Sequence, residues 1–270
     1  MSAASNIHSL LARLLPERVT PAPARHALRH RHFVGIGLPS QPTLPGERAR
    51  LVSRLDESSD PLEVYRDLRG QALEGSVAAL NDLGWIWLNG KYWRADTLLA
   101  GHLLRMAAMQ GDAMAWFNLG QQHYFGKGVK VSYSQAAECY RHAFERGMCH
   151  AAAALADLYE EEVCDPTLHW QVDLAEACQW FLRGAEQGEP RCRFEVGYRL
   201  LHGVHVQVDA KAALYWLELA AAAGVMQAAE ELAVHYSRRD GARYLSWRDQ
   251  AIEMGSALAL TMKLEDQVQG

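Results

Sequence analysis

Apolar side chains recur along most of the chain at spacings of three, four and seven residues. In one representative run the apolar positions are Ala136, Ala137, Tyr140, Ala143 and Phe144. This spacing places the side chains on one face of an α-helix, whereas a half-buried β-strand would alternate with a period of two. The pattern therefore predicts an all-α fold.

A glycine closes each of a series of similar phrases. The closing glycines are Gly75, Gly111, Gly147, Gly188, Gly224 and Gly255, at successive separations of 36, 36, 41, 36 and 31 residues. Each phrase contains two apolar runs separated by a loop, and a glycine after a helix adopts the left-handed cap conformation at little cost. A fixed period of this length indicates an array of one repeated unit, and we expect that unit to be a helix-turn-helix hairpin.

The cluster Gly126-Lys127-Gly128 raises the alternative of a phosphate-binding loop. Such a loop requires the pattern G-x-x-x-x-G-K-[ST], in which a hydroxyl follows the lysine. Gly128 stands at that position, and no strand-like apolar run leads into the cluster. We therefore expect Gly126 and Gly128 to form the turn between the two helices of one hairpin.

The segment from Ala113 to Met148 resembles the Sel1-like repeat, a tetratricopeptide-like helical hairpin of about 36 residues. The shared features are a Leu-Gly pair, a Gly-x-Gly-Val loop, an Ala-Ala pair and a closing glycine, here Leu119-Gly120, Gly126 to Val129, Ala136-Ala137 and Gly147. The resemblance implies an α-solenoid, a right-handed superhelix of antiparallel helical hairpins. We expect about five repeats and a partial N-terminal unit.

Two regions are expected along the chain. Residues 1–45 are basic and proline-rich and predict a flexible arm, whereas residues 46–270 predict the solenoid. The expected units are 46–75 (partial), 76–111, 112–147, 148–188, 189–224 and 225–255, followed by a C-terminal capping helix over 256–270. Within the partial unit, residues 47–57 predict a short helix, and Asp60 followed by Pro61 predicts the start of a second one.

The composition and the cysteine content of the chain indicate in which cellular compartment the protein is expected. No apolar run reaches the roughly 18 residues that a membrane helix needs, and the N-terminus is a poor signal peptide. The five cysteines form an odd set without a C-x-x-C pair, so we expect reduced thiols and a cytoplasmic protein. The group Cys139, His142, Cys149 and His150 has no recognised metal spacing, and small cysteines packed between helices are favoured there. No cofactor or metal is predicted.

The N-terminal 50 residues hold seven Arg and two Glu and no other charge, a net of +5 in a chain of net −5. The stretch "RHALRHRH" at 25–32 is either a basic arm that contacts nucleic acid or another acidic surface, or a solvated extension. The solvated extension is favoured because no aromatic residues interleave with the arginines to stack on bases. Nucleic acid is therefore not the expected partner.

No catalytic motif is apparent. The chain has no nucleophile elbow, no H-E-x-x-H and no S-x-x-K, although some secreted relatives of the Sel1-like family have been linked to β-lactam binding and hydrolysis. The acidic run from Asp157 to Glu162 suggests a cation site, but consecutive glutamates on a helix point in different directions. A protein without catalytic activity is predicted, with an enzyme or a metal-dependent module as the alternative.

The resemblance also implies a partner-binding surface, because the first helix of each hairpin lines the concave side of such a solenoid. In the register set by Leu119-Gly120, the inward positions are Trp85, Leu88, Gln121, Tyr124, Asp157, Glu160, Tyr198, Leu201, Val234 and Ser237. We expect a protein–protein interaction scaffold or adaptor that binds a protein or peptide there. Asp157 and Glu160 between two tyrosines favour a partner segment that is apolar with a central Lys or Arg.

The repeat from 148 to 188 carries a five-residue insertion in the segment from Val163 to Trp170. We expect this longer loop to carry His169 and Trp170 outwards as a secondary contact site. The alternative is an insertion without function, since extra loop residues cost little chain entropy.

Overall fold

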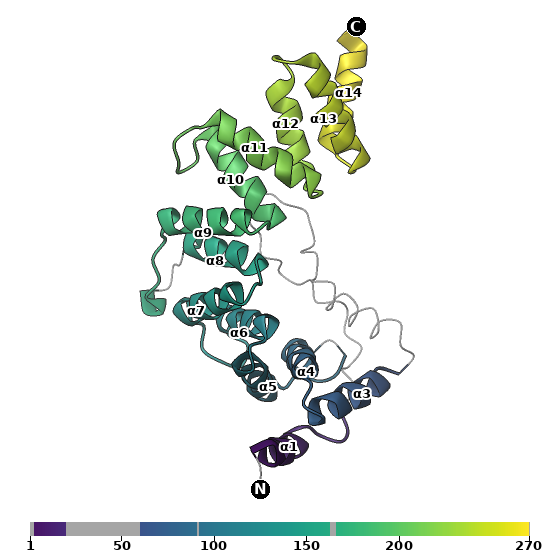
Figure 1. Cartoon of the computed structure of the whole chain (residues 1–270), viewed down its shortest axis with the longest axis vertical. Helices are drawn as coiled ribbons and strands as arrows, with labels where there is room; N and C mark the ends of the chain where they lie inside the picture. Colours follow the sequence, from purple (N-terminus) through teal and green to yellow (C-terminus); the bar gives the residue numbers. More distant parts are fainter. Residues whose placement is uncertain (1–2, 20–59, 91, 163–165, 270) are drawn as a thin grey trace. The chain divides into compact units, whose positions relative to one another are not determined.

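The computed structural model describes residues 3–19, 60–90, 92–162 and 166–269, and every regular element in these ranges is a helix (Figure 1). The predicted helix over 47–57 and the stretch "RHALRHRH" lie outside the described residues. The elements are α1 (Ala3–Leu14), α3 (Pro61–Leu73), α4 (Val77–Asn89), α5 (Thr97–Met109), α6 (Ala113–Phe125), α7 (Tyr133–Glu145), α8 (His150–Glu160), the 3-10 helix η1 (Pro166–Leu168), α9 (Leu174–Glu186), α10 (Pro190–His202), α11 (Ala210–Ala222), α12 (Met226–Tyr236), α13 (Gly241–Glu253) and α14 (Ala257–Gln269). None of the described helices combines the length and the apolar character needed to cross a membrane.

The chain divides into two compact units, an N-terminal unit of residues 1–148 and a C-terminal unit of residues 149–270. The N-terminal unit contains the hairpins α4/α5 and α6/α7, preceded by α3, which packs on α4. The C-terminal unit contains the hairpins α8/α9, α10/α11 and α12/α13, followed by α14. In both units the second helix of a hairpin also packs on the first helix of the next one. The predicted array of five helical hairpins and a final helix is therefore confirmed.

Local chemistry explains where the helices begin and end. Aspartate or serine side chains accept hydrogen bonds from the first turn of most helices, as Asp96 Oδ1 does from Leu99 N at 2.9 Å. The six closing glycines have φ between 88° and 98°, in the region that side chains disfavour. Gly126 (φ 65°) and Gly128 (φ 72°) reverse the chain between α6 and α7, so the predicted turn is confirmed.

The Leu-Gly pairs mark the closest approach of the two helices in a hairpin. A Cβ atom on Gly120 would lie 2.5 Å from Tyr140 Cε1, and one on Gly197 would lie 2.8 Å from Leu217 Cγ. Gly84 is similarly close to Leu104. These distances are shorter than any ordinary carbon contact, so the second helix can occupy its position only because the first helix carries glycine there.

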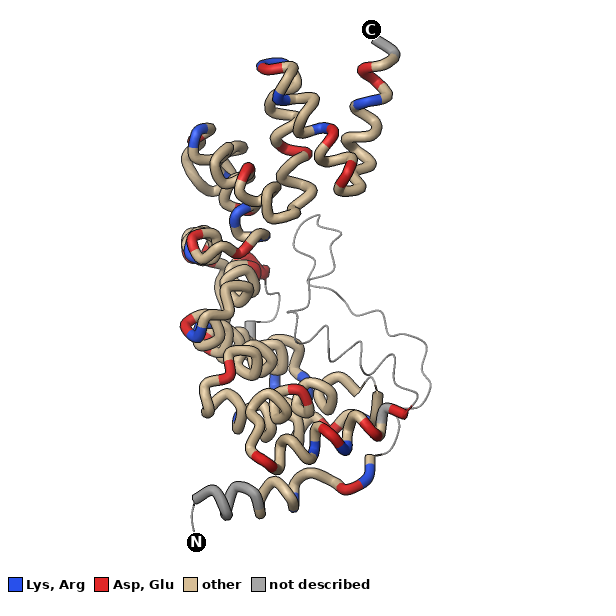
Figure 2. Tube along the Cα trace, turned by 45° about the vertical axis from the view of Figure 1, so that its right-hand side comes forward, with Lys and Arg blue, Asp and Glu red and all other residues tan. Residues whose placement is uncertain are grey.

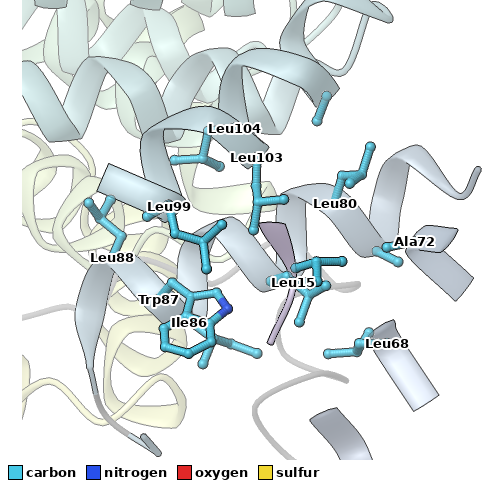
Figure 3. Packing of buried hydrophobic residues seen from close by; sticks show 14 of the residues in the cluster. Leu15, Leu68, Ala72, Leu80, Ile86, Trp87, Leu88, Leu99, Leu103 and Leu104 are labelled. Atoms are coloured by element: carbon cyan, nitrogen blue, oxygen red, sulfur yellow. The ribbon is translucent and has the colours of Figure 1, made fainter. Parts of the chain in front are cut away.

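The core of the N-terminal unit contains leucines and tryptophans from several helices. Figure 3 shows Leu68 of α3, Leu80, Ile86 and Trp87 of α4 and Leu103 of α5 gathered in this cluster. Two further buried rings add to it, with Tyr65 of α3 meeting Trp93 edge to face at a centroid distance of 5.2 Å. The first hairpin is thereby joined to α3 by a continuous apolar interior.

The prediction of a flexible arm over residues 1–45 is wrong for residues 3–19. Leu11 of α1 and Leu15 beyond it are almost fully buried and belong to the same core as Leu68 and Trp87 (Figure 3). Arg69 Nε donates a hydrogen bond to the Leu15 carbonyl at 3.3 Å, and the Tyr65 hydroxyl donates to the carbonyl of Pro16. The apolar face of α1 is stabilised by contacts with α3, which lies about 50 residues away in sequence.

Candidate protein-interaction surface

Three of the four predicted contact residues in the N-terminal unit are partly accessible. Trp85 on α4 packs its side chain partly against the core, while Gln121 and Tyr124 lie on the partly exposed side of α6. The Tyr124 ring lies 4.8 Å from Phe125 and 5.3 Å from Tyr133, measured between centroids. Phe125 itself is exposed, so α6 presents an aromatic group near its C-terminal end.

Leu88, the fourth predicted contact residue of this unit, requires a correction. Its side chain is only 4% exposed and belongs to the core cluster, where Figure 3 shows it beside Leu99. Leu88 lies next to Trp87 near the end of α4, at a point where the helix is covered by α5 rather than by solvent. A leucine at this position gains more by packing in the core than it would at a surface.

The loop after α6 connects successive repeats through polar side chains that the sequence pattern did not single out. Lys127 Nζ donates to Asn89 Oδ1 of the preceding repeat at 2.8 Å, and burial lowers the pKa of the Lys127 ammonium. The buried Gln122 amide donates to the carbonyls of Thr97 and Lys127, at 3.2 and 3.0 Å. Lys127 therefore has a structural role as well as its place in the turn.

A second polar contact joins α4 and α6 inside the same unit. The fully buried Asn118 donates from Nδ2 to Asn81 Oδ1 at 2.7 Å. The two asparagines lie 37 residues apart, about one repeat period, and that spacing is the one signal in the sequence that could have paired them. A buried amide pair of this kind favours one alignment of the two helices, because a shift would leave the amides unsatisfied.

The acidic residues predicted for the surface of the C-terminal unit are already paired within the chain. Asp157 on α8 receives two hydrogen bonds from Arg191 on α10, at 2.6 and 2.7 Å, and its side chain is buried. Glu160 lies 2.8 Å from Arg199, whose guanidinium also reaches Glu195 at 3.3 Å. The expectation that Asp157 and Glu160 await a cation from a partner is therefore wrong, because two arginines of α10 neutralise them.

These five charged side chains form one network between α8 and α10. The Arg199 guanidinium also stacks over the Phe181 ring at 4.7 Å, which holds it in place. Burial raises the pKa of the Glu195 carboxyl, although both arginines act to lower it. The pKa of Arg191 is raised, since the Asp157 carboxylate outweighs the effect of burial. The spacing Arg191, Glu195, Arg199 places one residue per helical turn on one face of α10, and sequence reasoning overlooked that signal.

Tyr198 and Leu201, two of the predicted contact residues, are partly exposed on α10. The Tyr198 ring lies between Phe194, at a centroid distance of 5.8 Å, and His202, at 4.5 Å. His202 Nε2 in turn lies 2.9 Å from the Glu231 carboxylate on α12. The tyrosine is therefore supported from both sides along the helix while part of its ring stays accessible.

Of the two contact residues predicted in the inserted loop, His169 is exposed as expected and Trp170 is not directed outwards. His169 is exposed, with a positive φ of 48°, directly after η1. Trp170 does not point outwards, because its Nε1 donates to the Leu158 carbonyl at 3.0 Å and its ring lies 5.2 Å from Tyr159. Trp170 thus fastens the loop to the end of α8, and only His169 remains available as a contact residue.

Two of the four cysteines that the structure describes, Cys139 and Cys192, are apolar packing groups. Cys139 and Cys192 are buried, and burial raises the pKa of the Cys139 thiol to about 12 and that of Cys192 well above its usual value. Among the residues that the structure describes, no three His, Cys, Asp or Glu side chains gather in a way that could hold a metal ion. These thiols are therefore poor nucleophiles.

Comparison with known proteins agrees with this architecture. The profile of the Sel1 repeat matches residues 77–112, 113–148, 150–189 and 190–225, together more than half of the chain. The chain belongs to the Sel1 repeat family. The matched repeats end before the hairpin α12/α13, in which α12 has 11 residues instead of the 13 of α10 and the connection is shorter.

Two relatives show the extent of the likeness. A crystal structure of a Sel1 repeat protein from Oxalobacter formigenes is similar with a TM-score of 0.62 and 27% identity, covering 78% of this chain and 88% of that one. An uncharacterized protein of Neisseria meningitidis serogroup B is 34% identical over 132 residues, which are 48% of this chain. The matched region spans about a quarter (26%) of the length of that curated relative.

Proposed function

We propose that this Sel1 repeat chain is a non-catalytic scaffold or adaptor that binds a protein or peptide on the face that the first helices of the hairpins present in each unit. The observation that carries the proposal is a partly exposed tyrosine on a first helix of each unit, Tyr124 on α6 and Tyr198 on α10. Tyrosine is enriched among the residues that dominate binding energy, because it combines a large apolar ring with a hydrogen-bonding hydroxyl.

The residues near the two tyrosines favour binding of a neutral or aromatic partner segment. Trp85 and Gln121, in the same unit as Tyr124, and Leu201, on the same helix as Tyr198, are also partly exposed. The neighbouring carboxylates of Asp157 and Glu160 are held by Arg191 and Arg199, so recognition does not require a basic residue in the partner. Within the inserted loop, the exposed His169 is the residue that we propose as an additional contact.

We also place the protein in a reducing compartment such as the cytoplasm. Four of its cysteines lie among the described residues, and all four are free thiols. Free buried cysteines are common where glutathione and thioredoxin keep thiols reduced. A thiol titration of the protein purified without reductant, compared with the same titration under denaturing conditions, tests this assignment.

The scaffold proposal is tested by affinity capture from the source cell, identification of the captured protein and measurement of its Kd with purified components. Tyr124→Ala combined with Tyr198→Ala should weaken binding by more than about 2 kcal/mol if the tyrosines are hot spots. Tyr215→Ala is the matched control, because Tyr215 is an exposed tyrosine on the second helix α11. Unchanged affinity in a folded double variant would exclude this face as the binding site.

A further inference from the structure

A hollow of about 360 Å³, which we call the α4/α5 hollow, opens beside the loop that joins α4 to α5. The residues that line it come from the segment after α1, from α4 and from the loop, and they are Arg18, Val19, Trp87, Arg94, Ala95 and Asp96. Gly90 (φ 61°) ends α4, and the Asp96 N–H donates to the Trp87 carbonyl at 3.1 Å. The loop beside the hollow is therefore held against the helix.

The α10/α11 hairpin of the C-terminal unit has a hollow at the matching place, about 720 Å³ in volume. Three residues of its lining are Leu200, Gln207 and Asp209, which correspond in the repeat register to Trp87, Arg94 and Asp96. Arg18 and Val19 have no counterpart in that lining. The hairpin fold itself thus provides a hollow, whereas the two arginines are particular to the α4/α5 hollow and need an explanation of their own.

Trp87 brings a buried hydrogen-bond donor to the wall of the α4/α5 hollow. Its side chain is 6% exposed, and its Nε1–H has no partner among the described residues. The fully buried Trp93 packs on it at a centroid distance of 5.7 Å, and its Nε1–H likewise has no partner in the part of the chain that the structure describes. Buried donors in folded proteins are nearly always paired. A ligand with acceptor atoms is therefore favoured at this wall.

Arg18 and Arg94 supply positive charge to the α4/α5 hollow. Both side chains are exposed, and neither forms an ion pair with a carboxylate of the described residues. Figure 2 shows positive and negative residues interspersed along the helices of the N-terminal unit, so the two arginines do not belong to a general excess of positive charge. Guanidinium groups present planar pairs of N–H donors that match the oxygens of an anion. The hollow is therefore suited to an anionic ligand.

The charge of the lining favours a carboxylate over a phosphate. Arg18 and Arg94 contribute two positive charges and Asp96 one negative charge, a net of +1. Asp96 keeps its position as the cap of α5, where Oδ1 accepts from the Leu99 N–H. A phosphate group carries a charge of about −1.5 to −2 near neutral pH, so it would leave excess negative charge beside Asp96. A carboxylate carries one negative charge and balances the lining.

We propose that the α4/α5 hollow binds a carboxylate group of a peptide or protein, which Arg18 and Arg94 hold from two different segments of the chain. An acidic side chain and the C-terminus of a chain offer the same carboxylate chemistry, and peptides that carry one or the other distinguish the two sources. The site consists of other residues than Tyr124 and Tyr198. It can therefore bind a short peptide whether or not the tyrosines bind a partner.

Titration of the isotope-labelled full chain with short peptides, followed by NMR at low ionic strength, tests the proposal. The probes are acetyl-Gly-Glu-Gly-amide, with a side-chain carboxylate, and acetyl-Gly-Gly-Gly with a free C-terminus, and acetyl-Gly-Gln-Gly-amide is the uncharged control. The indole N–H signals of Trp87 and Trp93 report on the hollow. We expect saturable shifts with at least one carboxylate peptide and none with the control. Low salt is needed because salt screens exposed charge pairs.

Substitutions of the charged residues should change the affinity in opposite directions. Arg18→Gln and Arg94→Gln should each raise the Kd of the carboxylate peptide about threefold, the size expected for one exposed charge pair. Asp96→Asn should lower this Kd, because the net charge of the lining rises while asparagine still caps the helix. Arg66→Gln is the matched control and should leave the Kd unchanged, since Arg66 is exposed on α3 in the same unit and does not line the hollow.

Several results would overturn the proposal. The hollow is not a carboxylate site if neither carboxylate peptide gives a saturable shift, or if the glutamine peptide shifts the indole signals equally. If Arg66→Gln weakens binding as much as Arg94→Gln, the attraction is a general effect of charge. Inorganic phosphate that binds more tightly than either peptide would show an unselective anion site instead.

Discussion

Asp157 on α8 and Arg191 on α10 are joined by two short hydrogen bonds, with Oδ1–Nη2 and Oδ2–Nη1 distances of 2.6 and 2.7 Å. The aspartate side chain is 8% exposed and the arginine side chain 24%. A pair this buried stabilises the contact between two successive first helices only while both members are present, because an unpaired buried charge is costly.

We therefore expect Asp157→Ala to lower the free energy of unfolding by about 3 kcal/mol, the cost of leaving a largely buried arginine unpaired. The double variant Asp157→Leu with Arg191→Met should recover much of that loss, since it removes both charges. Urea denaturation of the three proteins provides the comparison. Glu162→Ala, at an exposed position next to the same helix, serves as control. Equal stability of Asp157→Ala and this control would refute the structural role.

The glycine crossings give a second prediction. Gly120→Ala should destabilise the protein, and Gly120→Leu should cost a few kcal/mol, because the new side chain collides with the buried Tyr140. Gly70→Ala is the matched control in helix α3, where a Cβ would meet nothing within 4 Å. There alanine should raise stability by about 0.5–1 kcal/mol, since glycine is the poorer helix former. Thermal melts in which Gly120→Leu equals the wild type would contradict the crossing.

Acid should weaken the C-terminal unit through Glu189, the buried residue that caps α10. Burial acts to raise the pKa of its carboxyl, but hydrogen bonds from His150 and the Cys192 N–H outweigh it and bring the pKa below the usual 4.5. A carboxyl with a lowered pKa in the folded state stabilises the fold above that usual value. The contribution is lost as the pH falls through the lowered pKa.

The measurement for Glu189 is the free energy of unfolding between pH 7 and pH 3. Glu189→Gln keeps an oxygen acceptor for the Cys192 N–H but cannot titrate. The wild-type protein should therefore lose more stability than the variant over this range. Parallel pH profiles for the two proteins would show that Glu189 contributes nothing to acid sensitivity.

We expect substitutions of the two residues Trp170 and His169 in the inserted loop to differ in their effect on stability. Trp170→Ala removes a hydrogen bond to Leu158 and a ring contact with Tyr159, and should cost about 1–2 kcal/mol. His169→Ala should leave the melting temperature unchanged, because His169 is exposed. If Trp170→Ala is as stable as His169→Ala, the tryptophan does not fasten the loop.

The repeat architecture was predictable from the sequence because its determinants are local. Closing glycines such as Gly147 and Gly188 are needed for a backbone conformation at one residue, and apolar spacing within one helix sets which face is buried. The close crossing at Gly120 and Gly197 could be inferred as well, since the Leu-Gly pairs recur at matching places in the hairpins. The same register led to Tyr124 and Tyr198 as proposed contact residues, and both are partly exposed.

Only the tertiary structure decided which polar and apolar groups meet across repeats. Asp157 pairs with Arg191, 34 residues later, and α1 reaches the core through α3 although about 50 residues separate the two helices in sequence. The periodicity of the sequence predicts whether a side chain faces the core or the surface of its own helix. It does not predict whether a neighbouring helix supplies a charged partner or a packing contact for that side chain. A charged residue or a leucine at a predicted surface position can therefore be paired or buried by a residue that is distant in sequence. The packing between helices decides which residue that is.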